Sequence, residues 1–216
     1  MADAEGIEAV SMRRVARELG LGTMSLYHYV KSKDELLDLM GDGIMAGQLV
    51  DDDELAHGWR AGLSAIAHAT RGNFERHPWL SDAMRPRPNT IPGPNALRHV
   101  DQSLAAVADL DVDVRTRMKV IGLVDDYVIG FVTRAERAME TTSRDAEAEW
   151  IEAVFGHLRD EVESGAYPHL QAALEAHRAG GGTDEDLATM ATSEDRFEMG
   201  LEVLLDGVEV MLRRGR

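Results

Sequence analysis

The chain has no cysteine, which excludes disulfide bonds, thiolate metal ligands and cysteine nucleophiles. Aromatic residues make up only 5% of its 216 residues, whereas leucine, alanine, valine, methionine and glutamate are common, a composition that favours helices. No apolar run reaches membrane-spanning length, since Asp125 and Asp126 interrupt the strongest candidate at 120–124. No N-terminal pattern of a signal peptide is present. We therefore expect an all-α protein of the cytoplasm that does not enter a membrane.

Basic residues are scarce. Lysine and arginine number 23 against 39 acidic residues, which gives a formal net charge of −16. Such a balance argues against a protein that binds polyanions over its whole surface. Residues 11–33 are a local exception, because they carry five basic side chains and a single acidic one, Glu18. The composition is compatible with a specific, salt-sensitive DNA contact confined to this segment.

Residues 11–30 have the pattern of two short helices joined by a tight turn. Ser11 is suited to cap the first helix, because its hydroxyl can accept a hydrogen bond from an amide of the first turn. Apolar residues then recur at helical spacing, namely Met12, Val15, Ala16 and Leu19. Gly20 is placed to end this helix, since glycine readily takes the left-handed conformation. In the second helix, Leu26 and Val30 are expected to point inward together.

A glycine turn between two short helices, with cations on both sides, is the arrangement of a protein that reads the major groove. Arg13, Arg14 and Arg17 precede the turn, and Lys31 and Lys33 follow the second helix. Cations bind phosphates, whereas hydroxyl and aromatic side chains reach base edges. The alternative is an ordinary helical hairpin whose basic residues are simply solvated.

The same segment resembles the N-terminal helix-turn-helix of the TetR (tetracycline-repressor) family of bacterial transcription regulators. The likeness rests on SMRRVARELG and LGTMSLYHYVKSKDELL, and most of all on the LYHYV core and the KSKDELL run after it. It is strong over about the first fifth of the chain and loose over the remainder. The resemblance implies a helix-turn-helix DNA-binding domain at 1–45, followed by a larger helical domain at 46–216 for ligand binding and dimerisation.

The resemblance also implies roles for individual side chains. The helix at 23–29, which starts at Thr23, would enter the major groove. Arg13, by its position in the family motif, would contact a base such as guanine. Phosphate contacts are expected from Ser11, Tyr27, Lys31 and Lys33. Base contacts are expected from Ser25, His28 and Tyr29.

The start of the chain departs from the family pattern. The first six residues allow barely one turn of helix before Gly6, whereas family members have a longer first helix preceded by a basic arm. By that comparison the first helix is truncated. The shortfall predicts fewer partners for Val15, Leu26 and Val30, and a weakened affinity for DNA.

Hydrophobic periodicity predicts further helices along the rest of the chain. Their expected ranges are 32–50, 54–77, 95–108, 113–139, 145–164, 168–177 and 193–213. Ser32 is expected to cap the first of these, with Glu35 as its capping-box partner. Loops are expected at 81–95, which holds four of the six prolines, and at 179–186, which holds three consecutive glycines.

The helices expected at 145–164 and 193–213 carry wide apolar faces. We expect them to form a four-helix interface with a second copy of the chain, giving a homodimer. The alternative is that these faces only close the core of a single chain.

Large or soft side chains on interior helices are candidates to line a cavity for a small-molecule inducer. The candidates are Trp79, Met84, Met118, Tyr127, Phe131 and Phe155, and each of them could equally belong to the core. Asp125, Asp126 and Tyr127 interrupt the helix expected at 113–139. Some of these polar groups face such a cavity, or the carboxylates lie on a solvent-exposed strip.

No established catalytic motif occurs in the sequence, and the single Glu54-x-x-His57 lacks the second copy that a di-metal bundle needs. We therefore expect no enzyme and no cofactor, but a ligand-responsive repressor that binds a pseudo-palindromic operator in double-stranded DNA. One alternative is a helical-bundle small-molecule-binding protein or enzyme with a non-functional N-terminal hairpin. Another is a helical adaptor that binds protein partners without DNA.

Overall fold

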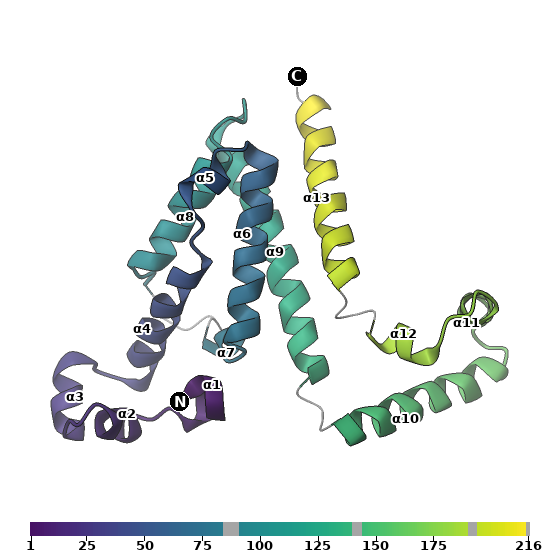
Figure 1. Cartoon of the computed structure of the whole chain (residues 1–216), viewed down its shortest axis with the longest axis horizontal. Coiled ribbons are helices and arrows are strands. Elements are labelled where there is room, and N and C mark those ends of the chain that lie inside the picture. The colour runs from purple at the N-terminus through teal and green to yellow at the C-terminus, as the bar shows by residue number, and fades with distance from the viewer. Residues whose placement is uncertain (84–90, 140–143, 190–193, 215–216) are drawn as a thin grey trace. The chain divides into compact units, whose positions relative to one another are not determined.

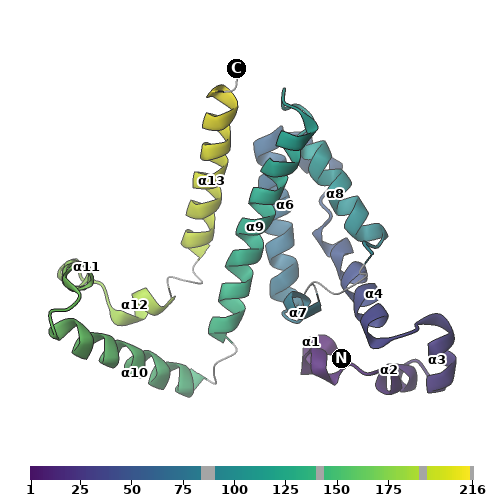
Figure 2. The same ribbon diagram turned by 180° about the vertical axis from the view of Figure 1, so that it is seen from behind.

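The structure is a computed structural model that describes residues 1–83, 91–139, 144–189 and 194–214 (Figure 1 and Figure 2). No strand occurs among these residues, and the expected all-α class is confirmed. The chain divides into two compact units, Met1–Val132 with Leu201–Arg216, and Thr133–Gly200. The first unit holds both the N-terminal helices and the bundle that follows them, and the functional boundary expected at residue 46 stays a prediction.

The N-terminal segment of the first unit forms the expected pair of short helices. Its elements are α1 (Ala2–Glu5), the 3-10 turn η1 (Ile7–Ala9), α2 (Met12–Glu18) and α3 (Thr23–Tyr29). The hydroxyl of Ser11 accepts a hydrogen bond from the amide of Arg14 at 3.3 Å. Gly20 has a φ of +68°, so both predicted signals around α2 are confirmed.

The helix expected at 32–50 is shorter and ends in a tighter turn. It comprises α4 (Lys33–Met45) and the 3-10 turn η2 (Ala46–Gln48). The hydroxyl of Ser32 accepts from the amide of Glu35 at 3.1 Å, which confirms the predicted cap. The carboxylate of Glu35 reaches back to the amide of Lys31 instead of Ser32, so the capping-box partner lies one residue earlier than expected.

The next predicted helix, at 54–77, is interrupted near its start. The structure has α5 (Asp52–Leu55) and α6 (Trp59–Arg76), separated at Gly58, whose φ is +89°. A short helix α7 (Leu80–Ala83) lies at the start of the segment expected as a loop, of which 84–90 lie outside the described residues. The following helices are α8 (Pro94–Ala106) and α9 (Val114–Met139), close to their expected ranges.

Close packing between α6 and α8 builds the interior of the first unit. A Cβ atom at Gly62 would stand only 2.9 Å from the Cβ of Ala106, so these helices approach where glycine leaves room. The inward sides of α6 and α9 are apolar and buried, as their helical spacing requires. Their buried side chains include Leu63, Ile66, Phe74, Val120, Val124 and Val128.

Ion pairs attach the last helix, α13 (Glu194–Arg214), to the first unit. The guanidinium of Arg60 on α6 contacts Glu202, lies 2.7 Å from Asp206 and lies 3.9 Å from Glu209. The residues of α13 buried next to these pairs are Leu201, Leu205 and Val208.

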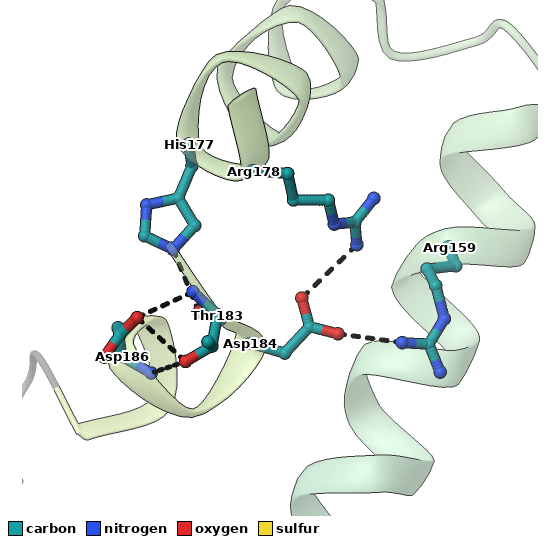
Figure 3. Close-up of polar contacts among 6 residues, drawn as sticks. All are labelled: Arg159, His177, Arg178, Thr183, Asp184 and Asp186. Carbon is teal, nitrogen blue, oxygen red and sulfur yellow. Dashed lines mark hydrogen bonds and ion pairs between the residues drawn. The ribbon is translucent and has the colours of Figure 1, made fainter. Parts of the chain in front are cut away.

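The second unit is a helical segment tied together by one carboxylate. It contains α10 (Arg144–Glu163), α11 (Pro168–Ala179) and α12 (Asp184–Thr189). Figure 3 shows Asp184 between Arg178 and Arg159, with contacts of 3.3 and 2.8 Å. These pairs join all three helices.

The glycine-rich loop expected at 179–186 was wrong in its second half, because α12 begins at Asp184. The carboxylate of Asp186 accepts hydrogen bonds from the amide and the hydroxyl of Thr183, at 2.6 and 2.8 Å. His177 Nε2 also lies 2.9 Å from the carbonyl oxygen of Thr183 (Figure 3). Local side-chain contacts thus order a segment whose glycines alone indicated flexibility. None of the helices in the described ranges has the length and apolarity needed to cross a bilayer.

Candidate nucleic-acid interface

Leu26 and Val30 anchor α3 from its inner side. They are 4% and 7% exposed and pack in one core with Met12 and Ala16 of α2. Trp79, from the segment between α6 and α7, belongs to the same core. Burial of this side fixes which side of α3 faces outward.

The outward side of α3 carries the side chains expected to meet DNA. Tyr29 is 76% exposed and Tyr27 is 39% exposed. Ser25 and His28 are exposed as well, and Thr23 is half-buried at the start of the helix. The structure therefore brings these five residues together on one short surface helix.

Arg14 differs from the other arginines of α2. Its guanidinium forms paired hydrogen bonds with the carboxylate of Glu5 in α1, one of them 2.8 Å long. This contact lowers the pKa of the Glu5 carboxyl and raises the pKa of Arg14. Arg13 is exposed, and Arg17 lies 3.8 Å from Glu18. Arg13 and Arg17 thus present their charge outward, whereas Arg14 holds α1 against α2.

Lys31 and Lys33 lie at the end of α3. The ammonium of Lys31 donates to the carbonyl oxygens of Tyr27 and His28, at 3.2 and 2.7 Å, and completes a turn whose carbonyls lack helical partners. Lys33 is half-buried at the start of α4. Ser11 is exposed at the start of α2, and its hydroxyl can still donate while it accepts the capping bond.

A polar contact ties α1 to the end of α6. Asp3 Oδ1 accepts hydrogen bonds from His77 Nδ1 at 2.7 Å and from the indole of Trp79 at 2.5 Å. These bonds, the one from His77 first, lower the pKa of the Asp3 carboxyl. Trp79 was expected to line a ligand cavity, but it is buried with the N-terminal helices and bonded to Asp3. Trp79 also lines a pocket together with Val15 of α2 and Met40 of α4, and its role in ligand binding stays a prediction.

The remaining cavity candidates are only partly brought together. Tyr127 and Phe131 lie on α9 with ring centroids 6.5 Å apart, and the guanidinium carbon of Arg71 lies 5.3 Å from the Phe131 centroid. Met118, on the same helix, is 45% exposed. Phe155 is buried in the second unit. Met84 lies outside the described residues.

The two carboxylates of α9 have different surroundings. Asp126 is exposed, as the solvent-strip alternative requires. Asp125 is half-buried, and its Oδ1 lies 3.9 Å from Nε2 of His99. Asp126 thus fits the solvent-exposed strip, whereas the contact of Asp125 with a buried imidazole leaves its place beside a cavity a prediction.

Sequence reasoning missed several residues that join helices. The clearest is Asp42 on α4, whose carboxylate accepts from the amides of Asn95 and Ala96 at 3.0 and 2.9 Å and so caps α8. The partners lie more than fifty positions apart, so no local pattern could reveal this cap. The Asp3–Trp79 contact escaped detection for the same reason. Arg14 and Glu5 are only nine positions apart, but they lie on separate helices, so no helical spacing marks their contact.

The sequence was compared with models of known protein families. Residues 1–40 match the family of bacterial regulatory proteins named tetR, and residues 53–212 match the tetracyclin repressor-like C-terminal domain. The chain belongs to the TetR family of transcriptional regulators.

Known transcriptional regulators are similar in sequence to most of the chain. The HTH-type transcriptional repressor DrrR1 of Streptomyces coeruleorubidus is 38% identical over 222 residues, covering 100% of this chain and 76% of that protein. An HTH-type transcriptional regulator of Saccharopolyspora erythraea is 32% identical over 168 residues, covering 78% and 67%. These relatives confirm that the chain is a transcriptional regulator.

Solved TetR-family structures share the fold. Apo ActR from Streptomyces coelicolor has a TM-score of 0.74 at 25% identity and covers 99% of this chain and 91% of that chain. ActR in complex with actinorhodin has a TM-score of 0.71 at 23% identity, with coverages of 98% and 92%.

Proposed function

We propose that this TetR-family regulator binds a pseudo-palindromic operator as a homodimer and that a small-molecule inducer releases it from DNA. The orientation of α3 carries the proposal, because Leu26 and Val30 are buried while Tyr27 and Tyr29 face outward. A repressor of this kind acts where the chromosome lies, in the cytoplasm.

In the surface around α3, some side chains are suited to contact phosphates and others to contact bases. In this proposal Arg13 contacts a base edge, and α3 enters the major groove from Thr23 onward. The proposed phosphate contacts come from Ser11, Tyr27, Lys31 and Lys33. The proposed base contacts come from Ser25, His28 and Tyr29. Arg14 has no direct role, since Glu5 holds its guanidinium.

The exposed side of α13 supports pairing with a second copy. Val203, Val210 and Met211 are 66%, 47% and 42% exposed. A Cβ at Gly207 would have no neighbouring atom within 4 Å. The spacing of these residues follows the helical repeat, so they form an apolar stripe on a different side from the buried leucines. We propose that this stripe pairs with its copy in the homodimer. A part for α10, which lies in the second unit, stays a separate prediction.

The inducer site is proposed to include Tyr127 and Phe131, with a contribution from Met118, all on α9 within the first unit. The expected role of Phe155, which lies in the second unit, stays a separate prediction. The guanidinium of Arg71 lies over the Phe131 ring and pairs with Glu75 at 2.7 Å, so its charge is already matched and the two aromatic rings favour an aromatic ligand. ActR, which shares the fold, is solved with actinorhodin, and this compound is therefore a first probe.

Selection of genomic fragments on the full chain tests the proposal. We expect the enriched fragments to share an inverted repeat, and scrambling one half-site should weaken binding by about 100-fold because two linked contacts become one. Titration of actinorhodin or related aromatic compounds into this complex then tests release. Failure to enrich any inverted repeat, or equal binding to one and two half-sites, would overturn the proposal.

A further inference from the structure

Side chains from α6 and α8 hold the turn that follows α4. The last carbonyl groups of a helix have no partner within it, and water usually satisfies them. Here Asn73 Nδ2 donates to the carbonyl oxygen of Ile44 at 3.1 Å, and Gln102 Nε2 donates to that of Gln48 at 3.1 Å. The turn at 46–50 therefore has its position set by the two neighbouring helices. We call these five residues the hinge segment.

The amide of Gln102 makes contacts in both directions. Its Oε1 accepts from the backbone amide of Val50 at 3.0 Å, while its Nε2 donates to Gln48. These two contacts fix which end of the amide is oxygen, because a flipped amide would set donor against donor and acceptor against acceptor. The second hydrogen of Nε2 is then directed at His99 Nδ1, 3.3 Å away.

The orientation of Gln102 in turn fixes the tautomer of His99, that is, which ring nitrogen carries the hydrogen. A donor at Nδ1 requires that nitrogen to be the unprotonated acceptor, so the neutral ring carries its hydrogen on Nε2. Nε2 lies 3.9 Å from Oδ1 of Asp125 on α9. The imidazole is about nine-tenths buried, whereas the carboxylate is 37% exposed. Hydrogen bonds thus connect His99 through Gln102 to the backbone of the hinge segment, and a half-exposed carboxylate lies 3.9 Å from the other side of the ring.

We infer that Gln102 is a positioning residue for operator binding and that His99, in its Nε2–H form, holds Gln102 in place. This inference rests on the proposed function of α3. A ligand group that hydrogen-bonds to Asp125 or His99 acts at one end of these contacts, and the hinge segment responds at the other. The ligand chemistry that fits is a hydroxyl group, which can accept from Nε2–H and donate to the carboxylate.

A second attachment explains why α8 carries the effect to α3. The carboxylate of Asp42 caps α8, and the side chain of Asn95 donates back to the carbonyl oxygen of Asp42 at 3.0 Å. Together with Gln102, this cap joins α8 to both α4 and the turn after it. Because α4 continues from α3, displacement of α8 displaces the reading helix as well.

Hydrogen exchange of the Val50 amide in the full chain measures directly how well the side chain of Gln102 is held against the hinge segment. We expect Gln102→Met to speed this exchange by about tenfold or more, because the acceptor is lost. His99→Phe should speed it too, although residue 99 does not touch Val50. Thr70→Val is the matched control, since the Thr70 hydroxyl is buried without a hydrogen-bond partner in the described part of the chain. Exchange of Val50 should be unchanged in that variant.

Long-range ¹H–¹⁵N spectra of the His99 ring give a readout that mere loss of packing does not move. We expect the Nε2–H form in the native chain. Gln102→Glu keeps an acceptor for Val50, loses the donor to the Gln48 carbonyl and offers an acceptor to His99, so Nδ1 should become protonated while the Val50 amide keeps its partner. This variant carries the test if Gln102→Met fails to fold. An Nδ1–H ring in the native chain, or Val50 exchange unaffected by Gln102→Met in a folded protein, would overturn the inference.

Binding to the selected operator fragment separates this inference from the proposed function. Gln102→Met should weaken operator binding by about tenfold, with Thr70→Val at the native affinity. Native operator affinity in Gln102→Met despite faster Val50 exchange would overturn the positioning role. If the native chain binds no fragment at all, the proposed function fails, and the positioning role that rests on it fails too. Val50 exchange and the His99 spectra then still decide whether the hydrogen bonds from His99 through Gln102 to the hinge segment exist.

Discussion

Helices α3 and α13 both expose apolar side chains, but their charged neighbours have opposite signs. Tyr29 on α3 is 76% exposed, and cations lie before and after that helix. Val203 on α13 is 66% exposed, and the carboxylates of Glu202, Asp206 and Glu209 on the same helix outnumber Arg60, with which they pair. Judged by exposure alone, the two helices would be expected to bind the same kind of partner.

The difference teaches that the flanking charge selects the partner of an exposed apolar helix. Cations around α3 favour a polyanion, since phosphates lie on both sides of the major groove. Carboxylates beside the stripe on α13 repel DNA and leave a second protein surface as the fitting partner. The predictions below test this comparison.

The largest expected effect is loss of the α3 platform itself. Leu26→Asp places a carboxylate in the core shared by α2 and α3, and an unpaired buried charge costs several kcal/mol. We expect loss of operator binding and a clear fall in melting temperature by circular dichroism. Met24→Asp makes the same change on the exposed side, so it should weaken DNA binding without lowering the melting temperature. Equal melting temperatures for both variants would contradict the assigned orientation of α3.

A charge on the α13 stripe should separate the two copies. In the proposed interface, Val203→Glu would set a carboxylate against its equivalent in the second chain, so we expect monomers by sedimentation and operator affinity lower by about 100-fold. Val114→Glu is the control, because Val114 is similarly exposed, at 67%, but lies on α9. A dimer that survives Val203→Glu would place the interface elsewhere.

Arg13 and Arg14 are neighbours with different expected functions. Arg13→Ala should cost about 1–3 kcal/mol on the native operator and relax the preference at one base pair. Arg14→Ala removes the contact with Glu5, so it should lower stability while the base preference stays the same. Operator libraries read by sequencing distinguish the two outcomes. An unchanged base preference in Arg13→Ala would remove that residue from the reading surface.

A phosphate contact should act evenly on all sequences. Lys33→Ala is expected to weaken cognate and scrambled DNA alike and to reduce the slope of log affinity against log salt by about 1. Lys119→Ala, an exposed lysine on α9, should leave that slope unchanged. A sequence-dependent loss in Lys33→Ala would instead make it a base contact.

The smallest expected effect concerns the attachment of α1. The folded state lowers the pKa of Asp3 below 3.8, so its charge stabilises the fold above that pH and this stabilisation is lost as pH falls through the folded value. Asp3→Asn should therefore destabilise the chain at pH 7, with the difference shrinking below pH 3.8. Denaturant titrations at several pH values measure this trend. Glu8→Gln, an exposed carboxylate nearby, serves as the control, and a gap that persists in acid would assign the effect to packing.

Sequence periodicity predicted the helices and the outward side of α3 well, because both depend on local spacing. Gly20 and Ser11 act within four residues of the positions they influence, so their signals are readable from the sequence. Gly58 was overlooked as an interruption, since one glycine in an apolar pattern is usually tolerated. The placement of Trp79 depended on a distant partner, Asp3, and no local rule supplies that contact.

Contacts between distant segments account for what remained hidden. Asp42 and Gln102 look like ordinary polar residues of a helix, and no residue near them in the sequence indicates which groups they will bind. Their importance arises because the carbonyl and amide groups they satisfy are brought next to them only by folding. The candidate DNA surface was accessible to sequence reasoning, whereas the contacts that join it to the bundle were not.

Gly93 shows how small a change would remove the cap that Asp42 provides to α8. A Cβ atom at that position would lie 2.3 Å from the carboxylate carbon of Asp42, closer than nonbonded atoms approach. One methyl group would therefore expel the carboxylate from the first turn of α8. The contact between α4 and α8, through which ligand and DNA would influence each other, therefore requires a residue without a Cβ atom at position 93.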